Sequence, residues 1–151
     1  METIHGAPSY ILYTAEVELA VTQIAGHLAP VTFHLPGLKA SPYSLSPWTP
    51  KQIDQSLPNL LTYLRGDFMC LPFGGQQKGP PHGDTANAPW QLVSSSATSL
   101  KLTQTGAGHA AHGPGKITQT LQSTRVRPAS TVTEARAKPM GSQRKRTGRS
   151  S

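Results

Sequence analysis

Side chains that could bind a hydroxyl-rich ligand are concentrated in one short stretch of this sequence, residues 64–90. The candidates are Arg65, Asp67, His82, Asp84, Asn87 and Trp90. Arginine and histidine supply directional donors, and an aromatic ring supplies a flat apolar wall. Glycines and prolines between them let the backbone approach a ligand and fix the direction of the chain. The stretch therefore predicts a polar pocket built on strand ends, which suits a sugar.

Arg65 and His82 are the two residues on which this interpretation mainly depends. Arg65 also allows a structural interpretation, because it could pair with Asp67 or cap a turn. His82 follows two prolines and precedes a glycine, a setting that favours ligand contact over a structural histidine. For Arg65 the two alternatives stay open.

The other candidates have strong structural alternatives. Asp84 and Asn87 belong to residue types that favour turns, and this interpretation outweighs ligand contact. Trp90 begins an alternating segment and is more typical of a core residue than of a sugar platform. All three nevertheless stay in the predicted site.

Metal and thiol chemistry are not expected. The only cysteine, Cys70, lies in an apolar run that indicates a buried, inert thiol, and a single cysteine excludes an internal disulfide. His109 and His112 have no third ligand nearby in the sequence, so no metal is expected. No other cofactor is expected.

Short alternating segments indicate an all-β protein. Alternation predicts strands over residues 16–24, 31–35, 90–94, 99–103 and 116–121, with a weaker strand at 10–13. The apolar segments 60–64 and 68–73 are predicted to be buried strands or strand-like turns. Residues 40–58 are predicted to form a long loop, with one helical turn over 51–57 that starts near Thr49 and Pro50. Short strands separated by turns are typical of a sandwich or barrel.

The net charge of +7 is located in one part of the chain. Up to Thr124 the six lysines and arginines balance six acids, whereas residues 125–151 hold eight basic residues and the single acid Glu134. The first part therefore has no electrostatic signature of a nucleic-acid binder. The second part has almost no large apolar residues, so we expect it to be disordered. No apolar run approaches the ~20 residues that a membrane span needs.

Two motifs resemble the galactose-mutarotase superfamily of aldose 1-epimerase-like β-sandwich proteins. The first is the Arg-Gly motif that runs into apolar-Cys-x-Pro-x-Phe-Gly, here Arg65–Gly74, as in the hexose-6-phosphate epimerase branch. The second is the His-Gly motif followed by tryptophan, here His82–Trp90. The segment Gly26–Phe33 is also similar to an early strand pair of that superfamily. The resemblance covers about Val17 to Gln122.

This resemblance implies a sugar site. In the superfamily an arginine and a histidine at these positions hold sugar hydroxyls, which implies the same role for Arg65 and His82. The phosphosugar branch has an arginine shortly after His-Gly that helps to bind phosphate, but this chain has Asp84, Thr85, Ala86 and Asn87 there. A bidentate phosphate contact needs a guanidinium or an equivalent group. The expected ligand is therefore an unphosphorylated monosaccharide or small aldose.

The catalytic part of the family pattern is missing. Mutarotation needs a general acid and a general base, and the superfamily supplies them from a second histidine and a glutamate well downstream of the His-Gly motif. Neither has a counterpart in matching context here. We therefore expect an aldose 1-epimerase-like protein that is truncated and inactive as it stands, with no catalytic residue identified.

The expected organisation is a partial mutarotase-like β-sandwich over residues 1–122 and a disordered basic tail over 123–151. An abrupt change to Arg/Ser/Pro/Thr-rich sequence is typical of a shifted reading frame, and a functional basic tail is the alternative. A half sandwich is expected to expose part of its inner face and to aggregate. The expected location is cytoplasmic. Two other functions stay open, namely a noncatalytic sugar-binding module and a nucleic-acid-associated protein that acts through its tail.

Overall fold

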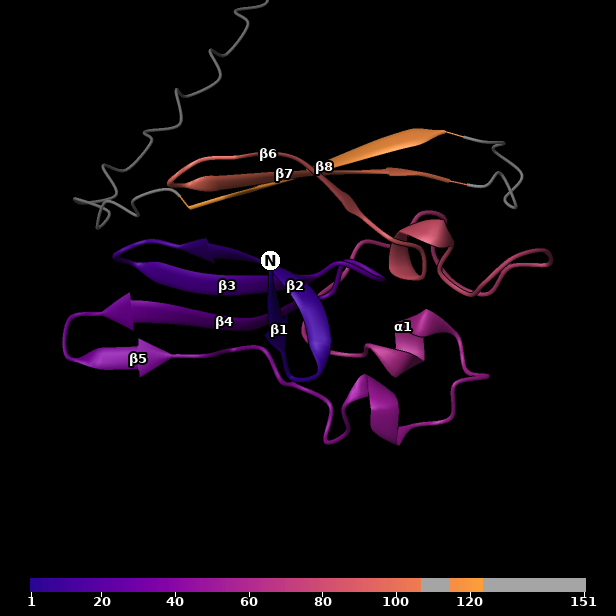
Figure 1. The fold of residues 1–151 in the computed structure, drawn as a ribbon, viewed down its shortest axis with the longest axis horizontal. Helices are drawn as coiled ribbons and strands as arrows, with labels where there is room; N and C mark the ends of the chain where they lie inside the picture. Colours follow the sequence, from indigo (N-terminus) through magenta and orange to yellow (C-terminus); the bar gives the residue numbers. More distant parts are fainter. Residues whose placement is uncertain (107–114, 124–151) are drawn as a thin grey trace, which may run out of the picture.

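The computed structural model of the chain describes residues 1–106 and 115–123, which form two antiparallel sheets (Figure 1). One sheet has five strands in chain order: β1 (Glu2–Ile4), β2 (Ala7–Tyr13), β3 (Val17–Thr22), β4 (Leu28–Leu35) and β5 (Leu38–Ala40). The other has three: β6 (Gln91–Ser95), β7 (Ser99–Thr105) and β8 (Lys116–Gln122). The prediction of an all-β fold is confirmed. The predicted tail, apart from Ser123, lies outside the described residues, as do His109 and His112.

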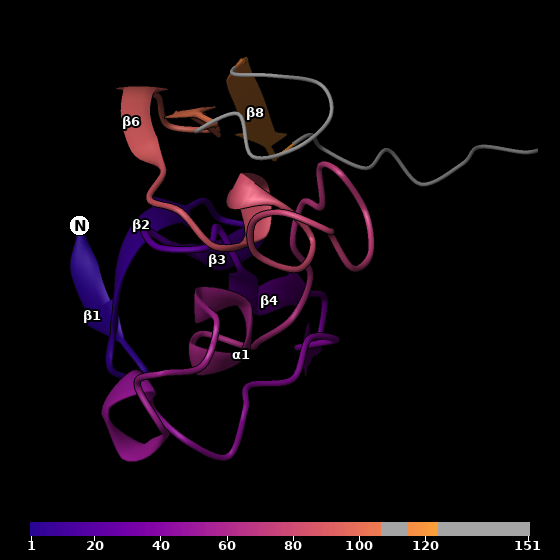
Figure 2. The same ribbon diagram turned by 90° about the vertical axis from the view of Figure 1, so that its right-hand side faces the viewer.

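A long irregular segment between β5 and β6 carries three short helical turns: η1 (Pro50–Gln52), α1 (Asn59–Thr62) and η2 (Asp84–Ala86). The five-stranded sheet curves around α1 on the side away from β6–β8 (Figure 2). Within the described ranges, no helix has the length and apolar character to cross a membrane.

In this segment two places were predicted to be buried strands or strand-like turns, and the strand alternative is wrong at both. Residues 60–64 overlap α1, where the backbone N–H groups of Leu61 and Thr62 both donate to Pro58 O and close a helical turn. Residues 68–73 form no strand, because the Leu71 N–H donates to the Thr85 side chain instead of to a neighbouring strand. An apolar run alone does not say which partner its backbone groups will find.

The strands β1 and β5 were not predicted, because each has only three residues and no visible alternation. Both are held by tight turns. In the first hairpin Ile4 pairs with Ala7, and the two residues between them, His5 and Gly6, have φ of 48° and 75°. Positive φ at both central positions fits a type I′ turn, whose twist matches that of the flanking strands.

The core lies between the two sheets. Tyr10, Leu12 and Val21 of the larger sheet pack against Leu100 and Leu102 of the smaller one. Trp90, fully buried, completes this cluster, and its carbonyl accepts a hydrogen bond of 2.9 Å from the Tyr10 hydroxyl. The sheets are therefore joined by apolar contact and by one buried polar link.

The inner face of the larger sheet extends past this core. In β4 the residues Val31, Phe33 and Leu35 share a face, and Leu38 of β5 lies opposite Leu35. Val31 is buried, but Phe33, Leu35 and Leu38 are 41%, 50% and 60% exposed. The inner face is thus partly uncovered at the β4–β5 hairpin.

Replacing this exposed pair should improve solution behaviour without loss of stability. In Leu35→Ser/Leu38→Ser we expect weaker binding of an apolar fluorescent dye and slower aggregation, with the free energy of unfolding changed by only about 0.5 kcal/mol. As a control, Leu102→Ser in the core should unfold the protein. Unchanged dye binding in the double variant would show that the hairpin is not the exposed apolar surface.

Candidate functional site

The turn between β3 and β4 brings the two sequence motifs together. On one side, the Leu28 N–H donates to Asp67 O at 2.7 Å, which pairs the start of β4 with the Arg-Gly motif. On the other side, the Ala25 N–H donates to Ala88 O at 3.1 Å and the Trp90 N–H donates to Gln23 O at 2.7 Å. Both motifs are therefore fixed to one structural element.

The two motifs also contact each other directly. Thr85 Oγ1 accepts a hydrogen bond of 2.8 Å from the Leu71 N–H. Gly83 lies so close to the Leu71 carbonyl that an added Cβ would be 2.2 Å from its oxygen, and its φ is 73°. Only glycine fits there, so the His-Gly pair of the motif has a packing reason for its glycine.

His82 is held in an unusual backbone conformation. The Gly83 N–H donates to Pro80 O at 3.1 Å, which closes a turn with Pro81 and His82 at its centre. The φ of His82 is 61°, and a type II turn requires such a value after a central proline. A non-glycine residue in this region costs on the order of 1–3 kcal/mol. The surrounding contacts must therefore supply that energy.

The ring of His82 has one occupied and one open nitrogen. The Gly74 N–H donates to Nδ1 at 3.2 Å, and the His82 N–H donates back to Gly74 O at 2.8 Å. Because Nδ1 acts as an acceptor, the neutral ring carries its proton on Nε2. Nε2 makes no hydrogen bond to any residue in the described ranges. It is a fixed donor without an internal acceptor.

Two phenylalanines flank this imidazole. The ring centroid of Phe73 lies 5.0 Å from that of His82 at 76°, and the centroid of Phe68 lies 6.2 Å away at 87°. Phe73 is 81% exposed, so its face is open to a ligand. The pair of His82 and Phe73 combines a directional donor with an apolar wall.

Arg65 lies in a different environment. It is 2% exposed, and its guanidinium donates to three backbone carbonyls, those of Tyr63, Ile4 and His5, at 3.3, 3.0 and 3.3 Å. Burial lowers its pKa, and among the described residues no carboxylate pairs with its guanidinium. The guanidinium of Arg65 faces backbone carbonyls, whereas the ring of His82 lies beside Gly74 and Phe73, so the two predicted donors do not face a common point.

Asn87 stabilises the turn that contains His82. Its Nδ2 donates to Pro81 O and to Gly83 O, both at 2.8 Å, and its Oδ1 accepts from the Leu60 N–H at 2.9 Å. The amide is 7% exposed and its hydrogen bonds go to the protein itself. Asn87 therefore positions the turn.

The three remaining candidates have structural contacts. Asp67 is exposed, and its carboxylate accepts a hydrogen bond from the Phe68 N–H. Asp84 begins η2, and its carbonyl accepts a hydrogen bond from the Gln104 side chain. Trp90 is fully buried in the core and donates from Nε1 to Thr85 O at 2.9 Å.

His27 belongs to this cluster and was missed by sequence reasoning. Its ring is fully buried and stacks on Phe68, with centroids 4.4 Å apart and an interplanar angle of 12°. Its Nδ1 accepts from the Arg65 backbone N–H at 3.2 Å. Its only signal was its place in the segment that resembles an early strand pair, directly after the turn glycine Gly26.

Burial and charge keep His27 neutral. Burial first, and the positive charge of Arg65 second, lower the pKa of His27 to about 4, against a smaller opposing effect of the Tyr63 carbonyl. That carbonyl is near the ring, but Nε2 has no partner with hydrogen-bond geometry among the described residues. His27 is therefore a neutral packing partner of Phe68.

The described residues give little support for thiol or metal chemistry. Burial and the negative charge of Asp67 raise the pKa of the half-buried Cys70 thiol, which disfavours the reactive thiolate. Residues 1–106 and 115–123 contain no group of three or more metal-ligating side chains.

Comparison of the chain with protein-family models, with curated proteins and with solved structures finds no match in any of the three. The resemblance to the mutarotase superfamily thus stays a prediction that rests on its two motifs.

Protonation of His27 should destabilise the fold. Its folded pKa, about 4, lies below the usual 6.5, so the unfolded chain binds a proton first as the pH falls. This contribution is complete above pH 6.5 and is lost as the pH falls toward 4, by about 2 kcal/mol between pH 7 and pH 5. His27→Asn keeps an acceptor for the Arg65 N–H but does not titrate, so urea unfolding should show a shallower pH dependence. Val21→Ala, destabilised with His27 intact, should keep the wild-type slope.

A Cβ at Gly66 should push the Arg-Gly motif away from the start of β4. Its φ is 50°, and an added Cβ would lie 1.9 Å from Leu28 O. We expect Gly66→Ala to lower the free energy of unfolding by at least about 2 kcal/mol. Gly75→Ala is the matched control, because nothing lies within 4 Å of its added Cβ and its φ is not positive. Equal stabilities of the two variants in urea titrations would contradict the close approach.

Proposed function

We propose that this chain is a sugar-binding protein of the aldose 1-epimerase type, which binds an unphosphorylated monosaccharide at His82 and Phe73. The observation that carries the proposal is the fixed, open Nε2 donor of His82 beside the 81% exposed ring of Phe73. A sugar has hydroxyl and ring oxygens that accept such a hydrogen bond, and an apolar C–H face that packs on an aromatic ring.

The environment of Arg65 favours an unphosphorylated ligand. A phosphate is held best by a guanidinium that presents two parallel donors. The guanidinium of Arg65 is buried and donates to three backbone carbonyls, so it is not available for such a contact. The resemblance implies a ligand role for Arg65. Its contacts favour a structural role instead, in which the residue stabilises the β1–β2 hairpin and the start of β4.

The described cluster supports binding rather than catalysis. Anomer interconversion needs an acid and a base that both reach the sugar. His82 offers one such group. His27, the second imidazole, is fully buried behind Phe68 and its Nδ1 is occupied, so it does not exchange protons with a ligand at His82. We therefore expect binding without acceleration of mutarotation.

Each of two different substitutions should weaken sugar binding. In NMR titrations of the full chain with galactose and glucose, we expect Phe73→Ala to weaken the affinity about 3-fold to 10-fold. His82→Asn should have a comparable effect, because asparagine tolerates positive φ but lacks the ring donor. Phe33→Ala is the control, since Phe33 is an exposed phenylalanine of β4, outside this cluster.

The same titrations test the ligand class and the absence of catalysis. Galactose 6-phosphate should bind no more tightly than galactose, and the anomers of bound sugar should exchange at the spontaneous rate. Tighter binding of the phosphate ester would contradict the ligand class, and faster exchange would show that the chain holds both an acid and a base. No saturable binding of any aldose would refute the proposal.

A further inference from the structure

The outer face of the five-stranded sheet contains a groove that is separate from the His82 cluster. Ile11 and Tyr13 alternate along β2 with the core residues Tyr10 and Leu12, so they point away from the smaller sheet. The groove on this face has a volume of about 340 Å³. Its lining includes the apolar side chains of Ile11, Ala20 and Pro30.

Two carboxylates lie at opposite ends of this groove. Glu2 of β1 is level with Ser9, and Glu18 of β3 is level with Tyr13. The two positions thus differ by four residues along β2 and by two strand spacings across the sheet, which separates their Cα atoms by about 16 Å. Both glutamates line the groove. A ligand that contacts both must be long and must carry a positive charge at each end.

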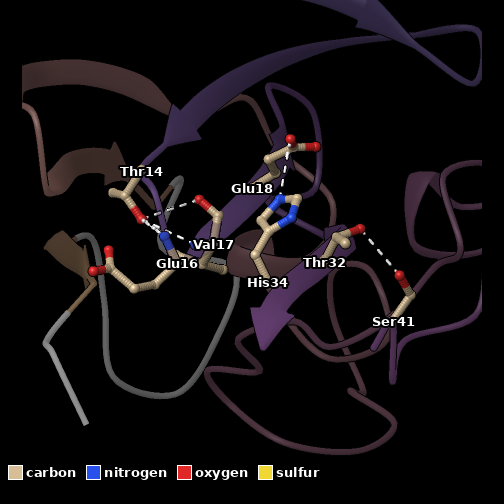
Figure 3. Close-up of polar contacts among 7 residues, drawn as sticks. All are labelled: Thr14, Glu16, Val17, Glu18, Thr32, His34 and Ser41. Carbon is tan, nitrogen blue, oxygen red and sulfur yellow. Dashed lines mark hydrogen bonds and ion pairs between the residues drawn. The ribbon is translucent and has the colours of Figure 1, made fainter. Parts of the chain in front are cut away.

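The carboxylate of Glu18 lies beside His34 but is still accessible. His34 Nε2 lies 3.1 Å from Glu18 Oε1, although the nitrogen is not aligned for a hydrogen bond. A dashed line marks this contact in Figure 3. The side chain of Glu18 is 44% exposed, so it can accept a further cationic partner. The neighbouring ring of Tyr13 is 69% exposed, and an aromatic face attracts an ammonium group.

We propose that this groove binds a linear polyamine of about the length of spermine. The terminal ammonium groups pair with Glu2 and Glu18, one of them beside the Tyr13 ring. The methylene segments pack against the apolar lining, and the two inner ammonium groups stay hydrated on the solvent side of the groove. Charge complementarity at both ends and apolar contact between them favour this ligand over a compact cation. A short diamine such as putrescine reaches only one of the two carboxylates.

Titration of the full chain with spermine and with putrescine tests this proposal. In calorimetry at low salt we expect saturable binding with one spermine per chain and at least 10-fold weaker binding of putrescine. Glu2→Gln and Glu18→Gln should each weaken spermine binding about 3-fold to 5-fold, as for an exposed ion pair. Asp54→Asn is the matched control, because this exposed carboxylate lies in the loop that carries η1 and is not part of the groove.

Three results would overturn the proposal. Equal affinities for the two amines would show that length does not matter. An effect of Asp54→Asn as large as that of Glu18→Gln would indicate unspecific attraction to acidic side chains. No saturable binding of spermine to the folded wild-type chain would remove the site altogether. Circular dichroism of each variant checks that the sheets are intact.

Discussion

The close pairing between the start of β4 and the Arg-Gly motif is the contact on which the candidate site depends. The Leu28 N–H donates to Asp67 O, and the Asp67 N–H donates back to Leu28 O at 3.4 Å. Gly66 makes this approach possible, because any side chain there would overlap the Leu28 carbonyl. From sequence, this glycine was interpreted as room for a ligand. In the structure the protein's own backbone occupies this space, and the ligand contact that we propose lies at His82 instead.

Burial of Arg65 explains several neighbouring features together. A guanidinium without solvent needs acceptors, and it finds them in the carbonyls of Ile4, His5 and Tyr63. These contacts connect the β1–β2 hairpin to the Arg-Gly motif. The same positive charge helps to lower the pKa of His27, and a neutral His27 keeps Nδ1 available for the Arg65 N–H. The charge state of the imidazole and its hydrogen bond are therefore consistent with each other.

Sequence reasoning succeeded where local periodicity decides the structure and failed where distant partners do. The strands β7 and β8 alternate clearly and lie close to their predicted bounds. The helical turn α1 was missed, since its Leu60 N–H is satisfied by Asn87, 27 residues away. For the same reason no pattern reveals that Arg65 binds carbonyls some 60 residues earlier in the chain. The sequence made both motifs visible. It did not show that Arg65 is buried against backbone carbonyls whereas His82 keeps an open ring nitrogen.

The contacts of its ring, rather than its backbone conformation, distinguish His82 from the other non-glycine residues with positive φ. Among the described residues, three that are not glycine have φ in the left-handed region: His5, Ala25 and His82. Each precedes a glycine. The ring of His5 lies against the Ser46 and Trp48 carbonyls, at 3.0 and 3.1 Å from Nε2, and Ala25 has no polar side chain to place. For these two residues the fold accounts for both backbone and side chain. At His82 the fold accounts for the backbone and for Nδ1, but Nε2 has no acceptor among the described residues, so the turn presents a donor that can bind a ligand or solvent.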